Sequence, residues 1–135
     1  EISECLVGSE MCIRDRDDNK LLVDAYNANP TSMRAAIENF RDMKVERRMV
    51  ILGDMGELGE SSWKAHQAIA DLLVESGFEH VWLVGPKFKA ARHPFRTFDS
   101  VEQVKKALGI KKPKGYYILI KGSHSTRLYD LPDFL

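Results

Sequence analysis

The amino-acid sequence predicts an α/β fold, a three-layer sandwich in which a mainly parallel sheet of about five to six strands lies between two layers of helices. Short apolar runs bounded by turn residues recur along the chain, as expected for strands that are buried on both faces. Between these runs, apolar residues repeat at helical spacing. Strands that alternate with helices imply right-handed crossovers and parallel pairing. A chain of 135 residues suits one such domain.

Two strand-loop-helix units open this pattern. KLLVDAY (20–26) is followed by Asn29, a suitable N-cap, and by Pro30, a suitable first helical residue. RRMVILGD (47–54) leads through a glycine-containing loop to a helix that we expect to end near Gly77. The supporting apolar stripes are Met33, Ala36, Ile37 and Phe40 in the first unit, and Ile69, Leu72 and Leu73 in the second.

Three further apolar runs predict strands at HVWLVG (80–85), RTFD (96–99) and GYYILIKG (115–122). Ser100 and Gln103 form an S-x-x-Q capping-box pattern, which predicts the start of a helix after the second of these strands. The final stretch, STRLYDLPDFL, indicates the beginning of a last helix.

Composition limits the classes of function. Lys and Arg balance Asp and Glu at 20 each, so the formal net charge is zero and no basic excess predicts a nucleic-acid partner. The apolar runs are too short to span a bilayer and charged residues flank them, so we expect no membrane segment. The sequence after residue 16 contains no cysteine, which is consistent with a reducing compartment.

Residues 1–16 form a segment of a different kind. They contain both cysteines, Cys5 and Cys12, and they lack clean periodicity. LVGSEMCIRD (6–15) matches the translation of a sequencing adapter. We therefore predict that residues 1–16 are a non-native (adapter-like) or disordered segment, and that the domain spans residues 17–135. A natural disordered or helical arm is the alternative.

Polar clusters follow three of the predicted strands: DAYNANP, GDMGELG and KGSHS. In an open parallel sheet, ligands bind beyond the carboxyl ends of the strands, where loops converge. Asn27 and Asn29 could exchange hydrogen bonds with a ligand, and Asp24 could accept hydrogen bonds from hydroxyl groups such as those of a ribose. Local chemistry alone favours structural roles, in which Asn29 caps its helix and Asp24 satisfies backbone amides.

The other two clusters leave the same choice open. Asp54 and Glu57 suit a flexible, glycine-turned loop in which both side chains are merely solvated. Lys121 ends a strongly apolar strand and is followed by Gly122 and Ser123, a position where an anionic ligand would be stabilised. For Lys121, the pattern supports a functional and a structural role equally.

Several chemistries have no support in the sequence. No spacing of His, Cys, Asp or Glu suggests a zinc site, and no serine sits in a nucleophile elbow. His66 is expected to be hydrogen-bonded and partly buried, and only His124 lies near a candidate site. The pattern G-x-x-x-x-G-K-[ST] is absent, so another domain must hold any triphosphate. Four aromatic residues are typical of packing rather than of base stacking, namely Trp63, Trp82, Tyr116 and Tyr117.

Three motifs carry a resemblance to a known family: VDAYNANPTSM, VILGDMGELG with His66 downstream, and LIKGSHS. Their order and spacing, from residue 19 to residue 128, resemble the C-terminal domain of the Mur ligase family. The Tyr-Asn-Ala-Asn-Pro stretch is most similar to the member that joins D-alanyl-D-alanine to UDP-N-acetylmuramoyl-tripeptide. Sister ligases have histidine-containing versions of this loop.

The resemblance implies a Rossmann-like domain of a three-domain, cytoplasmic, monomeric ligase of peptidoglycan precursor synthesis. It implies ATP as the cofactor, with magnesium held mainly by a central domain, and amide formation through an acyl phosphate. The N-terminal and central domains of the same protein would be the partners of this chain. A chain without them would be inactive alone, since the phosphate-binding loop lies outside it.

The resemblance also implies site residues. Asp24 would contact the ATP ribose, Asp54 would lie near the dipeptide, and Lys121 would orient the carboxylate of the dipeptide. It implies no catalytic residue and no metal ligand in this domain, and His124 falls where some relatives have an arginine. The implied nucleotide-binding residues are Asp24, Tyr26, Asn27 and Asn29, and the implied substrate-binding residues are Asp54, Lys121, Ser123 and His124.

Two alternatives stay open. The chain could belong to another Mur-type ligase or to a folylpolyglutamate synthetase-like ligase. It could also be a non-catalytic α/β binding module that kept the fold and lost the chemistry. The presence of Asp24, Asn27, Asn29 and Lys121 argues against this second alternative.

Overall fold

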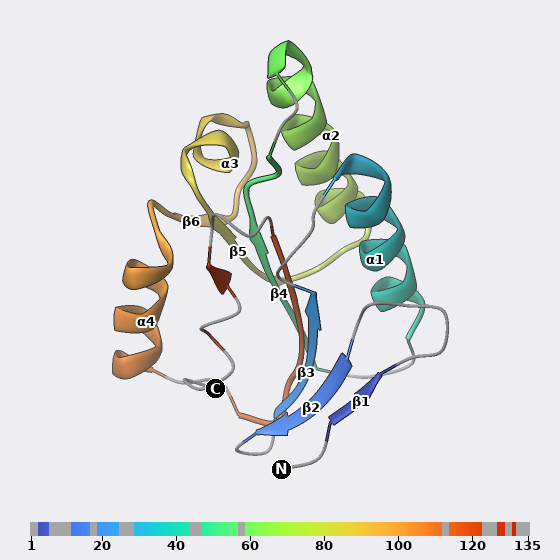
Figure 1. Ribbon diagram of the computed structural model, residues 1–135, viewed down its shortest axis with the longest axis vertical. Helices are drawn as coiled ribbons and strands as arrows, with labels where there is room; N and C mark the ends of the chain where they lie inside the picture. Colours follow the sequence, from blue (N-terminus) through green and yellow to red (C-terminus); the bar gives the residue numbers. More distant parts are fainter. Residues whose placement is uncertain are drawn as a thin grey trace.

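The computed structural model describes residues 3–5, 12–16, 19–24, 29–43, 47–56, 59–111, 114–122, 127–128 and 131. Within these ranges, one sheet has the strand order β1-β2-β3-β7-β4-β5-β6 (Figure 1). The strands from β3 to β6 in this order pair in parallel, so the predicted α/β class with a mainly parallel sheet is confirmed. Their bounds are β3 Asn19–Asp24, β7 Tyr117–Lys121, β4 Arg48–Gly53, β5 His80–Val84 and β6 Arg96–Phe98.

An antiparallel edge precedes the parallel strands. β1 (Ser3–Cys5) pairs with β2 (Cys12–Arg16), and β2 pairs with β3. Both added strands lie in the segment 1–16. The prediction that this segment is non-native concerns its origin, which strand pairing does not test. That prediction and the domain boundary at residue 17 therefore stay predictions.

Helices cover both faces of the sheet (Figure 1). α1 (Pro30–Asp42), α2 (Ser62–Glu75) and the short α3 (Pro86–Ala90) share one apolar cluster with the sheet, whereas α4 (Val101–Ile110) lies in a second cluster on the other face. Successive strand residues alternate between the clusters: Leu119 packs on the α1 and α2 side, and Ile118 and Ile120 pack on the α4 side. Burial on both faces explains why the strands read as continuous apolar runs.

Two predicted helix ends are confirmed. At the start of α1, the backbone N–H of Ser32 donates to Asn29 Oδ1 at 2.9 Å, and the N–H of Asn29 donates to Ser32 Oγ at 3.1 Å. Pro30 follows as the first helical residue, where its missing N–H costs nothing. At the end of α2, Gly77 has a φ of +76° and donates its N–H to the carbonyl oxygen of Val74.

Other expectations need correction. The predicted capping box at Ser100 is wrong, because the side chain of Ser100 makes no capping hydrogen bond and Gln103 Oε1 instead accepts from the N–H of Asp99 at 2.8 Å. The packing role predicted for Trp63 is wrong, since this side chain is 67% exposed. The helix α3 was not predicted. The expected last helix falls mostly outside the described residues, and no helix in the described part of the chain is long and apolar enough to cross a membrane.

Candidate functional site at the carboxyl edge of the sheet

The parallel register brings three distant chain segments to one edge of the sheet. Asp24, the last residue of β3, pairs in register with Lys121, the last residue of β7. Lys121 in turn pairs with Leu52 of β4, one residue before Gly53 and the turn that begins at Asp54. The positions of Asp24, Lys121 and Asp54 therefore converge, as the sequence predicts.

Four of the predicted site residues lie outside the described residues, namely Tyr26, Asn27, Ser123 and His124. For Asp24, the structure describes the backbone position at the end of β3. The roles assigned to all these residues stay predictions.

Lys121 occupies an unusual position for a lysine. Its side chain is only 2% exposed at the end of a central strand. Strand alternation places it on the same face as Leu119, under the α1 and α2 layer. Burial of an ammonium group is costly unless the group is paired, and Lys121 does have at least one noncovalent partner within the chain. The fold thus places a buried lysine side chain beside the strand ends.

Asn29 performs the structural role that local chemistry favours. Its side-chain oxygen is engaged by the Ser32 N–H in the cap of α1. A role in nucleotide binding would therefore use the NH₂ group of the amide as a donor or the second lone pair of the oxygen as an acceptor.

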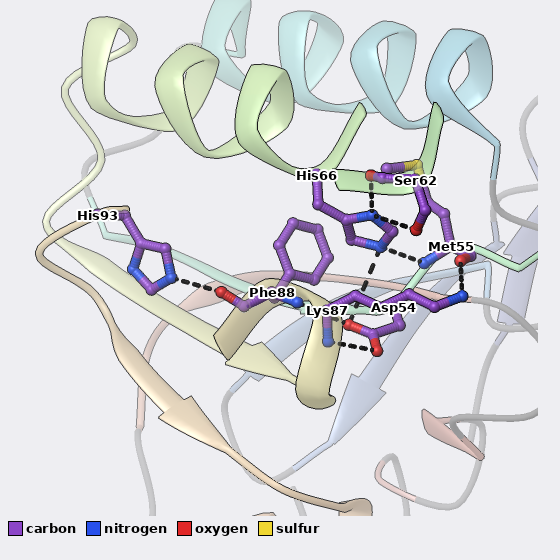
Figure 2. Close-up of polar contacts among 7 residues, drawn as sticks. All are labelled: Asp54, Met55, Ser62, His66, Lys87, Phe88 and His93. Atoms are coloured by element: carbon purple, nitrogen blue, oxygen red, sulfur yellow. Dashed lines mark hydrogen bonds and ion pairs between the residues drawn. The ribbon is translucent and has the colours of Figure 1, made fainter. Parts of the chain in front are cut away.

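Asp54 is not a solvated loop residue, so that alternative is wrong. The residue is 8% exposed, and its carboxylate accepts two backbone hydrogen bonds at 3.0 Å, Oδ2 from Lys87 N–H and Oδ1 from Phe88 N–H (Figure 2). These amides belong to the first turn of α3, where N–H groups have no partner within the helix. Asp54 therefore caps α3 from the turn after β4, and its negative charge suits the helix N-terminus.

The carboxylate of Asp54 requires a glycine at position 85. A Cβ atom built on Gly85 would lie 2.4 Å from Asp54 Cγ, and Gly85 has a φ of +115°. Both the contact and the backbone conformation exclude other residues without a local rearrangement. Gly85, directly after β5, thus leaves room for the side chain of Asp54, directly after β4.

His66 fixes the same loop from the helix layer. The buried ring accepts the Met55 N–H at Nε2 over 2.9 Å, and Nδ1 lies 2.7 Å from the carbonyl oxygen of Ser62, which assigns the proton to Nδ1 (Figure 2). Burial lowers the pKa of His66 below its ordinary value of 6.5, although the Ser62 carbonyl and the Asp54 charge oppose this shift. The prediction of a hydrogen-bonded histidine is confirmed, and its burial is complete.

Lys87 also holds the loop after β4 in place. Its ammonium Nζ donates to the carbonyl oxygen of Met55 at 3.3 Å, and the Met55 side chain is fully buried. Both backbone polar groups of Met55 are therefore engaged, one by α2 and one by α3. The sequence analysis missed Lys87. Its position directly after Gly85 and Pro86, where a helix can begin, was the available signal.

An open pocket of about 440 Å³ lies at the carboxyl ends of β4, β5 and β6. It contains groups of both charges, so it suits a ligand that carries both charges or several polar groups. Residues of this pocket from the different elements include Asp54, Lys87, Asp99, Ser100, Glu102 and Arg127. In the part of the chain that the structure describes, no group of three or more His, Cys, Asp or Glu could hold a metal ion. The expectation of no metal ligand in this domain stays a prediction.

The geometry defines a class of protein: a parallel α/β domain whose polar groups gather at the carboxyl edge of the sheet, where such folds bind ligands. The profile described as Mur ligase, glutamate ligase domain matches residues 11–124. The chain therefore belongs to the Mur ligase family, and the resemblance predicted from its motifs is confirmed.

Two of the similar proteins are ligases of the same name. The UDP-N-acetylmuramoyl-tripeptide–D-alanyl-D-alanine ligase of Treponema pallidum is 32% identical over 123 residues, which cover 84% of this chain and 27% of that protein. The ligase of the same name from Escherichia coli is 30% identical over 124 residues, covering 84% and 26%. The chain thus spans about a quarter of the length of these relatives.

Solved structures show the same fold. A structure of MurF from Acinetobacter baumannii has a TM-score of 0.73 and 28% identity, over 88% of this chain and 28% of that one. The MurF ligase of Thermotoga maritima in complex with ADP has a TM-score of 0.76 over 90% of this chain and 29% of that one. At 22% identity, the second similarity is evidence for the fold alone.

Proposed function

We propose that this chain is the C-terminal domain of a longer, cytoplasmic and monomeric ATP-dependent ligase. The intact enzyme would join D-alanyl-D-alanine to UDP-N-acetylmuramoyl-tripeptide in peptidoglycan precursor synthesis. The names of the relatives support the reaction. The observation that carries the proposal is the convergence of Asp24, Lys121 and the Asp54 loop at the carboxyl edge of the sheet.

The residues at this edge fit a nucleotide. A carboxylate at the end of β3 suits the hydroxyl groups of a ribose, and the buried charge of Lys121 suits an anionic group beside it. ATP would supply the phosphoryl group that activates the carboxylate of the tripeptide. The first loop, with Tyr26, Asn27 and Asn29, would complete the nucleotide contacts. We assign magnesium mainly to the central domain of the intact enzyme.

In the substrate part of the site, the residues would act by positioning the dipeptide, and none of them would act as a covalent nucleophile. We assign Lys121, together with Ser123 and His124, to the carboxylate of the incoming dipeptide. Asp54 would contribute to the dipeptide site through the loop that it fixes, because both of its oxygens accept hydrogen bonds from α3. Fixed dipoles and charges of this kind stabilise a transition state without reorganising during the reaction.

The test uses the full-length enzyme and a Lys121→Met variant, which keeps an unbranched apolar side chain and removes the charge. ATP-dependent amide formation from the tripeptide and D-alanyl-D-alanine is measured. We expect kcat/KM for the dipeptide to fall by roughly 100-fold or more, as for loss of one stabilising donor. Lys64→Met, at an exposed position on α2, is the matched control and should keep the activity of the unmodified enzyme.

Two results would contradict the proposal. If the Lys121→Met enzyme is folded and its kcat/KM is unchanged, the role assigned to Lys121 is wrong. Faster ligation of glutamate than of D-alanyl-D-alanine by the full-length protein would instead identify another Mur-type or folylpolyglutamate synthetase-like ligase.

A further inference from the structure

A second hollow lies at the opposite edge of the sheet from the candidate site. It has a volume of about 390 Å³ and is formed at the amino ends of β4, β5 and β7. Arg47 precedes β4, His80 begins β5, and Tyr116 precedes β7. The residues that line the hollow include Arg47, His80, Trp82, Lys111, Lys114 and Tyr116.

The charges that line this hollow have one sign. Arg47, Lys111 and Lys114 are all exposed there, and none of the described residues that line the hollow is acidic. Among the described residues, no carboxylate forms an ion pair with any of these three side chains, although several other surface cations are paired. The pairs elsewhere on the surface include Lys89 with Asp99 at 2.7 Å, Lys105 with Glu102 at 3.4 Å and Arg41 with Asp42 at 3.3 Å.

The total charge of the chain is zero, so this concentration of cations results from their placement. A concave surface lined by charges of one sign focuses the electrostatic potential and attracts counter-ions. Mutual repulsion among the three cations is relieved when an anion binds between them.

Arg47 is held in place before any ligand arrives. Its guanidinium Nη1 donates to the carbonyl oxygen of Lys114 at 3.4 Å, and its Cζ lies over the ring of Tyr116, 5.8 Å from the ring centroid. Its own carbonyl oxygen accepts the Tyr117 N–H at 2.8 Å, which ties the residue to the start of β7. A charged group that is already ordered loses less conformational entropy on binding.

The walls of the hollow are aromatic. The half-buried ring of Trp82 packs on Phe98 with centroids 5.0 Å apart, and the ring of Tyr116 meets His80 edge to face at 5.4 Å. Rings fixed by such neighbours form a rigid apolar surface beside the cations. The hollow therefore combines an anion-binding rim with a flat apolar wall.

We infer that the amino edge of the sheet binds a phosphate ester of a flat, partly apolar molecule. The phosphate lies among Arg47, Lys111 and Lys114, and the flat body lies against Trp82 and Tyr116. A multiply charged phosphate matches three cations better than a single carboxylate does. This site is separate from the candidate ligase site, so either can fail a test without the other.

Trp82 allows the test to report on this edge alone. The chain has two tryptophans, and a Trp63→Phe background leaves Trp82 as the only one. Adenosine monophosphate is titrated as the probe while Trp82 fluorescence is followed, and adenosine and inorganic phosphate are titrated in parallel. We expect a saturable change with the nucleotide, and weaker binding of both adenosine and inorganic phosphate, since each lacks one half of the recognised structure.

Charge-removing variants locate the binding. Arg47→Ala and Lys114→Ala should each weaken binding of adenosine monophosphate by roughly tenfold, the loss expected for one charge-assisted contact. Lys64→Ala, which removes an exposed cation on α2, should leave the affinity unchanged. Circular dichroism checks that each variant is folded, and the exposed position of Lys114 makes it the safer of the two substitutions.

Several results would overturn the inference. The absence of a saturable signal at millimolar nucleotide would exclude the site. Equal affinity in folded Lys114→Ala and Arg47→Ala would show that the cations do not hold the phosphate. Equal affinity for adenosine or for inorganic phosphate would exclude the proposed class of ligand.

Discussion

At the scale of single residues, His66 connects a helix to the loop after β4. Its Nδ1–H donates to Ser62 and its Nε2 accepts from Met55, so only the neutral ring can make both hydrogen bonds. Burial lowers its pKa below 6.5, so the unfolded chain takes up a proton at a higher pH than the folded chain does. The stability that neutral His66 contributes is therefore fully present above about pH 6.5 and is lost as the pH falls toward the lowered pKa.

A His66→Leu variant tests this role. Leucine fills much of the same space but cannot accept the Met55 N–H, and an unsatisfied buried donor costs about 1–3 kcal/mol. We expect the free energy of unfolding at pH 7.5 to fall by about this amount in urea titrations. Between pH 7.5 and 5.5 the variant should lose less stability than the unmodified chain, since the titrating ring is gone. Parallel pH profiles for the two chains would contradict the assignment.

The sequence predicts some of these residue roles and not others. The position of Asn29 before Pro30 predicts a cap from local chemistry alone, and the structure has that cap. The partners of Asp54 and His66 depend on chain segments that are 33 and 11 residues away, respectively. A carboxylate in a glycine-rich loop looks the same in the sequence whether it is solvated or buried against another helix. Only the packing of β4 against β5 distinguishes these cases.

At the scale of elements, α3 shows why a short helix escapes prediction. It has five residues and contributes one buried apolar side chain, Phe88, so no helical stripe marks it in the sequence. A helix of this length is not stable by itself. The Asp54 carboxylate at its N-terminus and the packing of Phe88 on His66, with ring centroids 4.7 Å apart, hold it in place.

Gly85→Ala should therefore disrupt α3 and the loop after β4 together. The added methyl group meets the Asp54 carboxylate and also forces alanine into a positive φ. We expect a loss of roughly 2–4 kcal/mol in the free energy of unfolding, from backbone strain and lost charge-assisted hydrogen bonds. Chemical denaturation of the purified chain measures this change.

Gly77→Ala is the matched control for this substitution. Gly77 also has a positive φ, but a Cβ atom there would meet nothing within 4 Å. Its substitution should cost only the backbone strain, about 1–2 kcal/mol. Equal losses for the two variants would show that contact with Asp54 contributes nothing.

At the scale of the whole molecule, the alternation of strands and helices predicts the parallel sheet, and the parallel sheet predicts which edge carries the polar loops. The strand order is not contained in that alternation. β7 lies between β3 and β4 although it comes last in the sequence among the described strands, and this position places Lys121 between Asp24 and the Asp54 loop. The sequence thus predicts which residues belong to the site. Which of them are neighbours depends on the strand order of the sheet.

The chain supplies positions and charges at this edge but no phosphate-binding loop of the G-x-x-x-x-G-K-[ST] type. We therefore expect the purified 135-residue chain to release no ADP from ATP in the presence of the tripeptide substrate and D-alanyl-D-alanine. The full-length enzyme, assayed at the same concentration, should release ADP and form the amide. The genomic sequence upstream of residue 17 provides an independent measurement, since the proposed ligase requires a G-x-x-x-x-G-K-[ST] domain there. ATP-dependent ligation by the 135-residue chain alone would show that this domain contains the whole catalytic apparatus, and an unrelated upstream domain would favour a binding module.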